Sequence, residues 1–102
     1  MEFELEGLPG EEMINAGLRD LEEGKVTVPA LLVAIGAPRL ARLNIQFTIP
    51  DLPDWPEMCL YRLLCQEDPQ QGYARYNGLT RLLVSFERAL EREQGDVLRA
   101  ER

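Results

Sequence analysis

The sequence predicts an all-α fold: a small bundle of four to five helices organised on one long C-terminal helix. Over residues 72–94, apolar residues recur at steps of three and four, the spacing of an amphipathic helix. Prolines and glycines divide the preceding chain into shorter segments that also carry helical patterns. Strict period-two alternation is confined to residues 1–6 and 45–49, which predicts at most a minor two-stranded β-ribbon made by these segments.

The long helix carries an apolar stripe formed by Tyr76, Leu79, Leu83, Phe86 and Leu90. About 23 residues at about 1.5 Å each give a rod of roughly 35 Å, near the width of a domain of this size. We therefore expect the other helices to pack on this stripe. Beyond it, we expect residues 95–102 to form a frayed tail.

Capping signals locate the first two helices. Pro9-Gly10 and the two glutamates that follow are typical of a helix start, and Gly24 is placed to end that helix. Thr27 is a candidate N-cap for the second helix. Residues 30–35 are apolar all round, so this second helix is predicted to form the buried centre of the bundle.

Two further helices follow the break at Gly36. A short helical turn carries Arg39 and precedes the proline-rich connection, and Asp54 is then a candidate N-cap for a longer helix. Glu57 stands three residues after Asp54 and would complete a capping box. Residues 57–66 contain few polar side chains, which predicts that this helix is mostly covered.

Length and composition indicate one domain, residues 1–102, in which residues 1–8 form an N-terminal arm or a strand. Hydrophobic residues at 45% and charged residues at 28% are typical of a soluble protein, and the net charge of −7 disfavours nucleic acid as a partner. The chain has no apolar run near the ~20 residues that a membrane span needs, and its N-terminus is acidic. Two cysteines make no disulfide framework, so we expect a cytoplasmic protein without a membrane contact.

The chain contains no histidine, which excludes imidazole-based catalysis and the commonest metal ligand. Cys59 and Cys65 are about 240° apart around a helix, so they are expected to be small core residues rather than ligands of one metal. The carboxylate pairs Asp20/Glu23 and Asp54/Glu57 leave a magnesium-dependent helical hydrolase as a weak alternative. We expect no catalytic residue, no cofactor and no metal ligand.

Polar residues of the long helix form the candidate interaction surface. Arg81, Arg88 and Arg92 make a basic stripe opposite the apolar stripe, which is either a solvated face or a contact for an acidic partner. Beside it runs a mixed strip of Tyr73, Asn77, Thr80 and Val84, which is either a half-buried seam bonded to a neighbouring helix or a small-ligand pocket. The candidate interaction surface consists of the three arginines together with Tyr73, Tyr76, Asn77 and Thr80.

These observations favour a non-catalytic protein–protein interaction module or assembly subunit, whose partner is another copy of the chain or an unknown protein. The alternative is a small DNA-associated regulator, in which residues 36–45 form the turn and second helix of a helix-turn-helix. That reading depends on Arg39 and Arg42, in a region without acids. Replacing both arginines with glutamate separates the two readings, because only the regulator needs them for binding.

Overall fold

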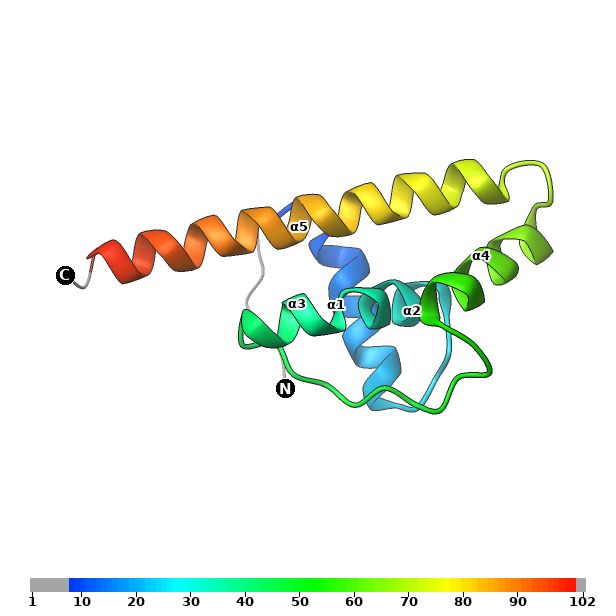
Figure 1. The fold of residues 1–102 in the computed structure, drawn as a ribbon, viewed down its shortest axis with the longest axis horizontal. Helices are drawn as coiled ribbons and strands as arrows, with labels where there is room; N and C mark the ends of the chain where they lie inside the picture. The colour runs from blue at the N-terminus through cyan, green and yellow to red at the C-terminus, as the bar shows by residue number, and fades with distance from the viewer. Residues whose placement is uncertain (1–7, 101–102) are drawn as a thin grey trace.

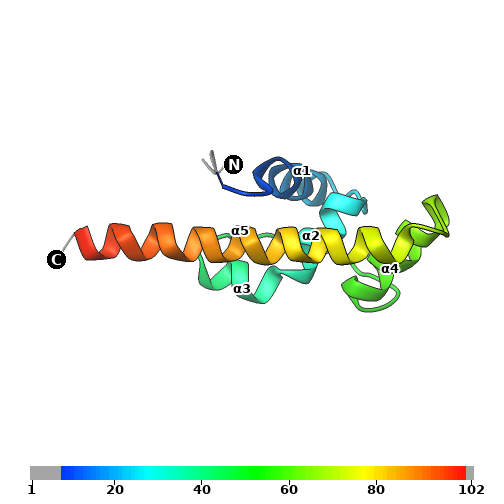
Figure 2. The ribbon, with the colours of Figure 1, turned by 90° about the horizontal axis from the view of Figure 1, so that it is seen from above.

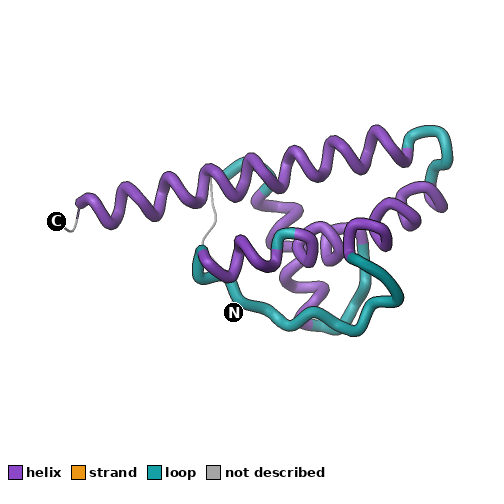
Figure 3. The backbone as a smooth tube through the Cα atoms, viewed as in Figure 1, coloured by secondary structure: helices purple, strands orange, loops and turns teal. Residues whose placement is uncertain are grey.

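The computed structural model describes the backbone of residues 8–100 and the side chains of residues 8–94. Over this range the chain is helical without a strand, which confirms the all-α class (Figures 1 and 3). The elements are α1 (Glu11–Glu22), α2 (Val28–Ile35), α3 (Ala37–Arg42), α4 (Pro56–Glu67) and α5 (Gly72–Ala100).

Helix α5 sets the long axis of the molecule, and the other helices gather along it. Its 29 residues span about 43 Å at ~1.5 Å each, against a longest molecular extent of 50 Å. Seen from above, α1 lies on one side of α5 and α3 lies on the other, while α4 lies across the N-terminal end of α5 (Figure 2). The C-terminal end of α5 extends beyond α3 with no other helix beside it (Figure 1).

The ends of α1 are those that the sequence predicts. Gly10 precedes the helix with φ 78°, and Gly24 follows it with φ 75°, both in the left-handed region that glycine tolerates best. Between them, the buried face of α1 contains Ile14, Leu18 and Leu21. This face packs mainly against α2.

Helix α2 is the buried centre of the fold, as predicted. All five side chains from Ala30 to Ala34 are buried, and the helix packs against α1, α4 and α5. Thr27 is its N-cap: the Ala30 amide donates a hydrogen bond of 3.2 Å to the Thr27 hydroxyl oxygen. That hydroxyl also donates to a carboxylate oxygen of Asp20 at 2.6 Å. One side chain therefore starts α2 and ties it to α1.

The apolar stripe of α5 faces the core. Leu83, Phe86 and Leu90 are buried, while Tyr76 and Leu79 are partly buried and pack against the same cluster. Helix α4 and helix α2 both contact α5, as expected from the stripe. The backbone remains helical to Ala100, past the point near Gly95 where the sequence suggested an end.

The predicted β-ribbon is not present over Ile45–Ile49, which is an extended connection without a strand partner. Ile45 is buried and Phe47 is half-buried and packs on the core, whereas the polar residues between and after them and Ile49 are exposed. Only the first two apolar residues of the alternation therefore contact the core. The other predicted half, residues 1–6, lies outside the described residues.

The start of α4 also differs from the prediction. Its N-cap is Trp55, which makes no capping hydrogen bond with its side chain, and Pro56 occupies the first turn. Asp54 instead accepts a hydrogen bond of 2.8 Å from the Trp55 amide, the residue directly after it. Proline fits the first helical position because it lacks the amide hydrogen that would be unpaired there. The capping box of Asp54 and Glu57 is consequently absent.

Candidate functional site

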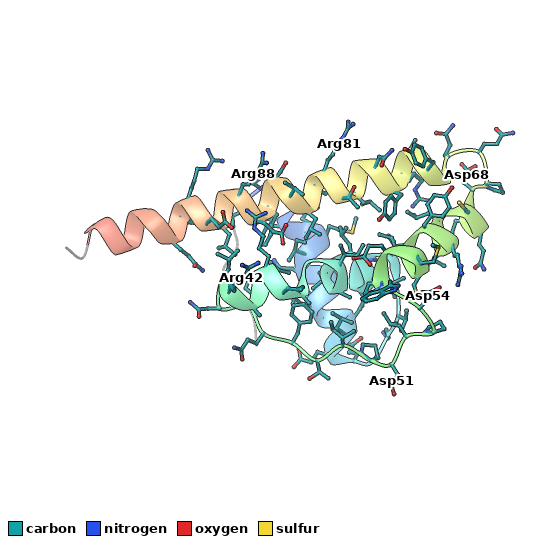
Figure 4. The ribbon with its side chains drawn as sticks, in the orientation of Figure 1. Arg42, Asp51, Asp54, Asp68, Arg81 and Arg88 are labelled. Carbon is teal, nitrogen blue, oxygen red and sulfur yellow. The ribbon has the colours of Figure 1, made fainter. Side chains whose placement is uncertain are left out.

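The basic stripe lies on the outer side of α5. Arg81, Arg88 and Arg92 are all exposed, and none forms an ion pair with the part of the chain that the structure describes. Figure 4 shows Arg81 and Arg88 pointing away from the other helices. Three guanidinium groups in a row thus face solvent, although the charge of Arg88 also acts on Glu91.

The two tyrosines of the candidate interaction surface differ in their surroundings. Tyr73 is 66% exposed, whereas Tyr76 is half-buried and meets Tyr61 of α4 in an edge-to-face contact with ring centroids 5.8 Å apart. Burial first, and then the charge of Glu57, raise the pKa of Tyr76 above its ordinary value. The Tyr76 ring therefore helps to hold α4 on α5, whereas most of Tyr73 faces solvent.

Asn77 and Thr80 belong to the mixed strip of α5 and are half-buried. The Thr80 hydroxyl donates a hydrogen bond of 3.0 Å to the Asn77 carbonyl oxygen within α5. Its donor is therefore satisfied inside its own helix, and no neighbouring helix is needed for it.

The sequence missed an exposed apolar surface at the α4 end of the molecule. Among the described side chains, seven large hydrophobic residues are exposed, and four of them belong to α4, its N-cap and the first turn of α5. We call these four the aromatic surface: Trp55, Met58, Tyr61 and Tyr73. Helix α4 is therefore not mostly covered, because Leu60 and Leu64 alone are fully buried in it.

The members of the aromatic surface are neighbours. Trp55, Met58 and Tyr61 follow each other at steps of three, which places them along one side of α4. The pKa of Tyr61 is raised, first by a hydrogen bond with the Cys65 thiol and further by the hydroxyl of Tyr73. The spacing of three is visible in the sequence, but it does not show whether this side of α4 is exposed, because buried helix faces have the same spacing.

A shallow pocket opens beside Trp55. It has a volume of about 420 Å³ and is lined by the loop from Ile49 to Pro56, including Asp51 and Asp54. Asp54 is occupied, since one oxygen lies 3.3 Å from the Arg62 guanidinium and the other accepts the Trp55 amide. Asp51 is exposed and makes no ion pair or side-chain hydrogen bond with any described residue. We refer to this hollow as the acidic pocket.

The two arginines of the DNA-binding alternative are not both free to contact DNA bases. Helix α3 has six residues, and Arg39 donates a hydrogen bond of 2.7 Å from Nε to Glu91 of α5. Arg39 is also 3.9 Å from Glu87. Arg42 is exposed and lies on the side of α3 toward the projecting part of α5 (Figure 4). One of the two arginines is thus engaged in holding α3 on α5.

Glu87 is a buried carboxylate on the inner side of α5, with 4% of its surface exposed. Its pKa is raised, chiefly because burial disfavours the charged form. The charge of Arg39 partly offsets this shift, and the charge of Glu91 adds to it. Glu91 is affected in the opposite direction, because its hydrogen bond with Arg39 lowers its pKa.

The raised pKa of Glu87 predicts a pH dependence of stability. Above the ordinary carboxyl value of 4.5, the folded protein still holds a proton that the unfolded chain has released. The free energy of unfolding therefore falls as the pH rises through the raised pKa. Glu87→Gln removes this loss, so the variant should gain stability over the wild type between pH 4.5 and 7.

Denaturant unfolding across this pH range measures the effect, and Glu93→Gln on the exposed side of α5 controls for the lost negative charge. A constant difference between Glu87→Gln and the wild type at every pH would contradict the prediction.

The carboxylate and cysteine positions show no converging donor set. Asp20 accepts a hydrogen bond from the Thr27 hydroxyl, and Cys59 and Cys65 are both half-buried and form no disulfide. Among the described residues, no group of three or more His, Cys, Asp or Glu side chains is placed to hold a metal ion. Within the same part of the chain, no helix is long and apolar enough to cross a bilayer.

Comparison with known proteins adds no family to this description. No protein-family model, curated protein sequence or solved structure matches the chain. The functional argument therefore rests on the exposed and unpaired side chains described above.

Proposed function

We propose that this protein is a non-catalytic interaction module that associates with further copies of itself, and that the aromatic surface is part of its contact area. The observation that carries the proposal is the gathering of Trp55, Met58, Tyr61 and Tyr73 at one end of the molecule. Single exposed apolar residues are ordinary, but several together mark interaction sites.

The residue types of this surface support an interface over a simple solvent-facing region. Trp, Tyr and Met are enriched in the centres of protein–protein interfaces, and Trp and Tyr are common among the residues whose truncation costs most binding energy. Trp55 is 76% exposed and lies at the rim of the acidic pocket, so one aromatic ring is free to contact a partner. Burying these side chains against a second copy removes their apolar surface from water, and this stabilises the association.

The setting that we propose for this module is the cytoplasm. Cys59 and Cys65 are free thiols on one helix and form no disulfide. Free, partly buried cysteines suit a reducing compartment.

Sedimentation velocity over a range of protein concentrations tests the proposal. The wild type should shift to larger species as concentration rises. Replacing Trp55 with alanine and Met58 with glutamate should weaken this association at least about 30-fold, since losing an interface anchor costs about 2 kcal/mol or more.

The matched control is Val26→Glu, which places the same charge on an exposed apolar residue outside the aromatic surface. Val26 lies in the connection between α1 and α2, so it belongs neither to α4 nor to α5. It should leave the association unchanged. Equal weakening by both variants, or a wild type that stays monomeric at every concentration, would reject the aromatic surface as a self-contact.

A further inference from the structure

The acidic pocket has the chemistry of a site for a guanidinium group. Trp55, which is 76% exposed, and Asp51, whose carboxylate has no ion pair with a described residue, both line it. An indole face attracts a cation, and a planar guanidinium can stack on the ring while donating hydrogen bonds to a carboxylate. Asp54 is already bonded to Arg62, so Asp51 is the acceptor available for a new cation.

The charge around the pocket points to the same kind of occupant. The residues that line the pocket include two acids, Asp51 and Asp54, and no basic residue. Arg62 is itself neutralised by Asp54 at 3.3 Å. A negative surface with an exposed aromatic ring favours a positively charged partner over an acidic one.

The complementary group exists on this same chain, on the other side of the molecule. The basic stripe of Arg81, Arg88 and Arg92 is exposed and forms no ion pair within residues 8–94. In Figure 4, Arg81 and Arg88 point outward above α5, while Asp51 points out of the opposite side. The two surfaces face away from each other, so one chain cannot neutralise them internally.

We propose that the acidic pocket of one copy receives the basic stripe of α5 from a second copy, so that the chains join head to tail. This inference rests on the proposed self-association and names its two surfaces. Because the surfaces differ, each added copy leaves one pocket and one stripe free. Growth continues past two chains, and salt weakens it because exposed charges are screened.

The test uses two variants of the full chain, each with one surface impaired. The pocket variant carries Asp51→Ala with Trp55→Ala, and the stripe variant carries Arg81→Ala, Arg88→Ala and Arg92→Ala. Neutral replacements are used because charge reversals at both surfaces could pair with each other. All five positions are exposed, and a circular-dichroism melt verifies the fold of each variant. Arg19→Ala, at an exposed arginine of α1, controls for the loss of positive charge.

Sedimentation velocity should show wild-type species larger than two chains, which decrease as salt is added. Each variant alone should need at least tenfold higher concentration to associate, and Arg19→Ala should match the wild type. An equimolar mixture of the two variants should form a complex that stops at two chains, because one intact pocket then meets one intact stripe.

Three outcomes would overturn the head-to-tail contact while leaving self-association intact. They are a wild type that stops at two chains, a variant that associates like the wild type, and a mixture that behaves as two separate monomers. A wild type that is monomeric at every concentration would remove both this inference and the proposed function. The two failures are therefore distinguishable.

Discussion

Replacing Phe86 with alanine is expected to lower the free energy of unfolding by about 3–5 kcal/mol. Phe86 has no exposed surface and is the bulkiest of the fully buried side chains. It lies between Leu83 and Leu90 on the face of α5 that packs on the core. Its truncation removes the burial of an aromatic ring and leaves a cavity in a close-packed interior. Chemical denaturation followed by helical circular dichroism measures the loss.

Two other substitutions fix the interpretation of this result. Phe86→Leu retains a large apolar side chain and should cost clearly less than Phe86→Ala. Val84→Ala, at an exposed position two residues away, should change stability by no more than about 0.5 kcal/mol. If Phe86→Ala were as stable as Val84→Ala, α5 would not be part of the core.

The helices that the sequence predicted best are those whose evidence is local. The apolar stripe of α5 and the uninterrupted apolar run of α2 depend on spacing alone, and both ended buried as expected. Thr27 capped α2 because a side chain needs only to reach an amide three residues on. Asp54 failed as a cap because Pro56 fixed the start of α4 one residue later.

The exposed surfaces were harder to predict because exposure depends on which other elements cover a helix. The apolar residues of α4 indicated a covered helix, yet the fold places neighbours over Leu60 and Leu64 and leaves Met58 exposed. The arginine stripe of α5 was foreseeable, since three arginines at steps of seven and four occupy the side opposite the apolar stripe. The position of this stripe relative to Asp51 could not be predicted, because it depends on how the loop after α3 crosses the molecule.

None of the long-range polar contacts was predicted from the sequence. Arg39 was assigned to a possible DNA contact, but it bonds with Glu91, 52 residues away. Gln94 likewise donates a hydrogen bond of 2.7 Å to the Leu43 carbonyl, which ties the end of α3 to α5. No local spacing distinguishes such a partner from the other acids and amides of the chain. These contacts follow from packing α3 under α5.

Gly17→Ala is expected to lower the free energy of unfolding by about 3 kcal/mol, although alanine is the better helix former. Gly17 is buried in α1 where that helix crosses the first turn of α2. A Cβ atom at this position would fall inside van der Waals contact with the Pro29 carbonyl oxygen and only 2.5 Å from a methyl carbon of Val33. The Pro29 atom belongs to the backbone, so α1 and α2 must separate to make room.

Gly78→Ala is the matched control, because it makes the same chemical change at an exposed position of α5. A Cβ atom there would have no neighbour within 4 Å, and the variant should gain about 1 kcal/mol from helix propensity alone. The two glycine variants should therefore shift stability in opposite directions when unfolding is measured at low protein concentration, where self-association does not contribute. If Gly17→Ala also gained stability, α1 and α2 would have to be further apart than described, and the small residue would have no packing role. A loss at Gly17 together with a gain at Gly78 would establish that backbone contact between α1 and α2, and not backbone flexibility, requires glycine at position 17.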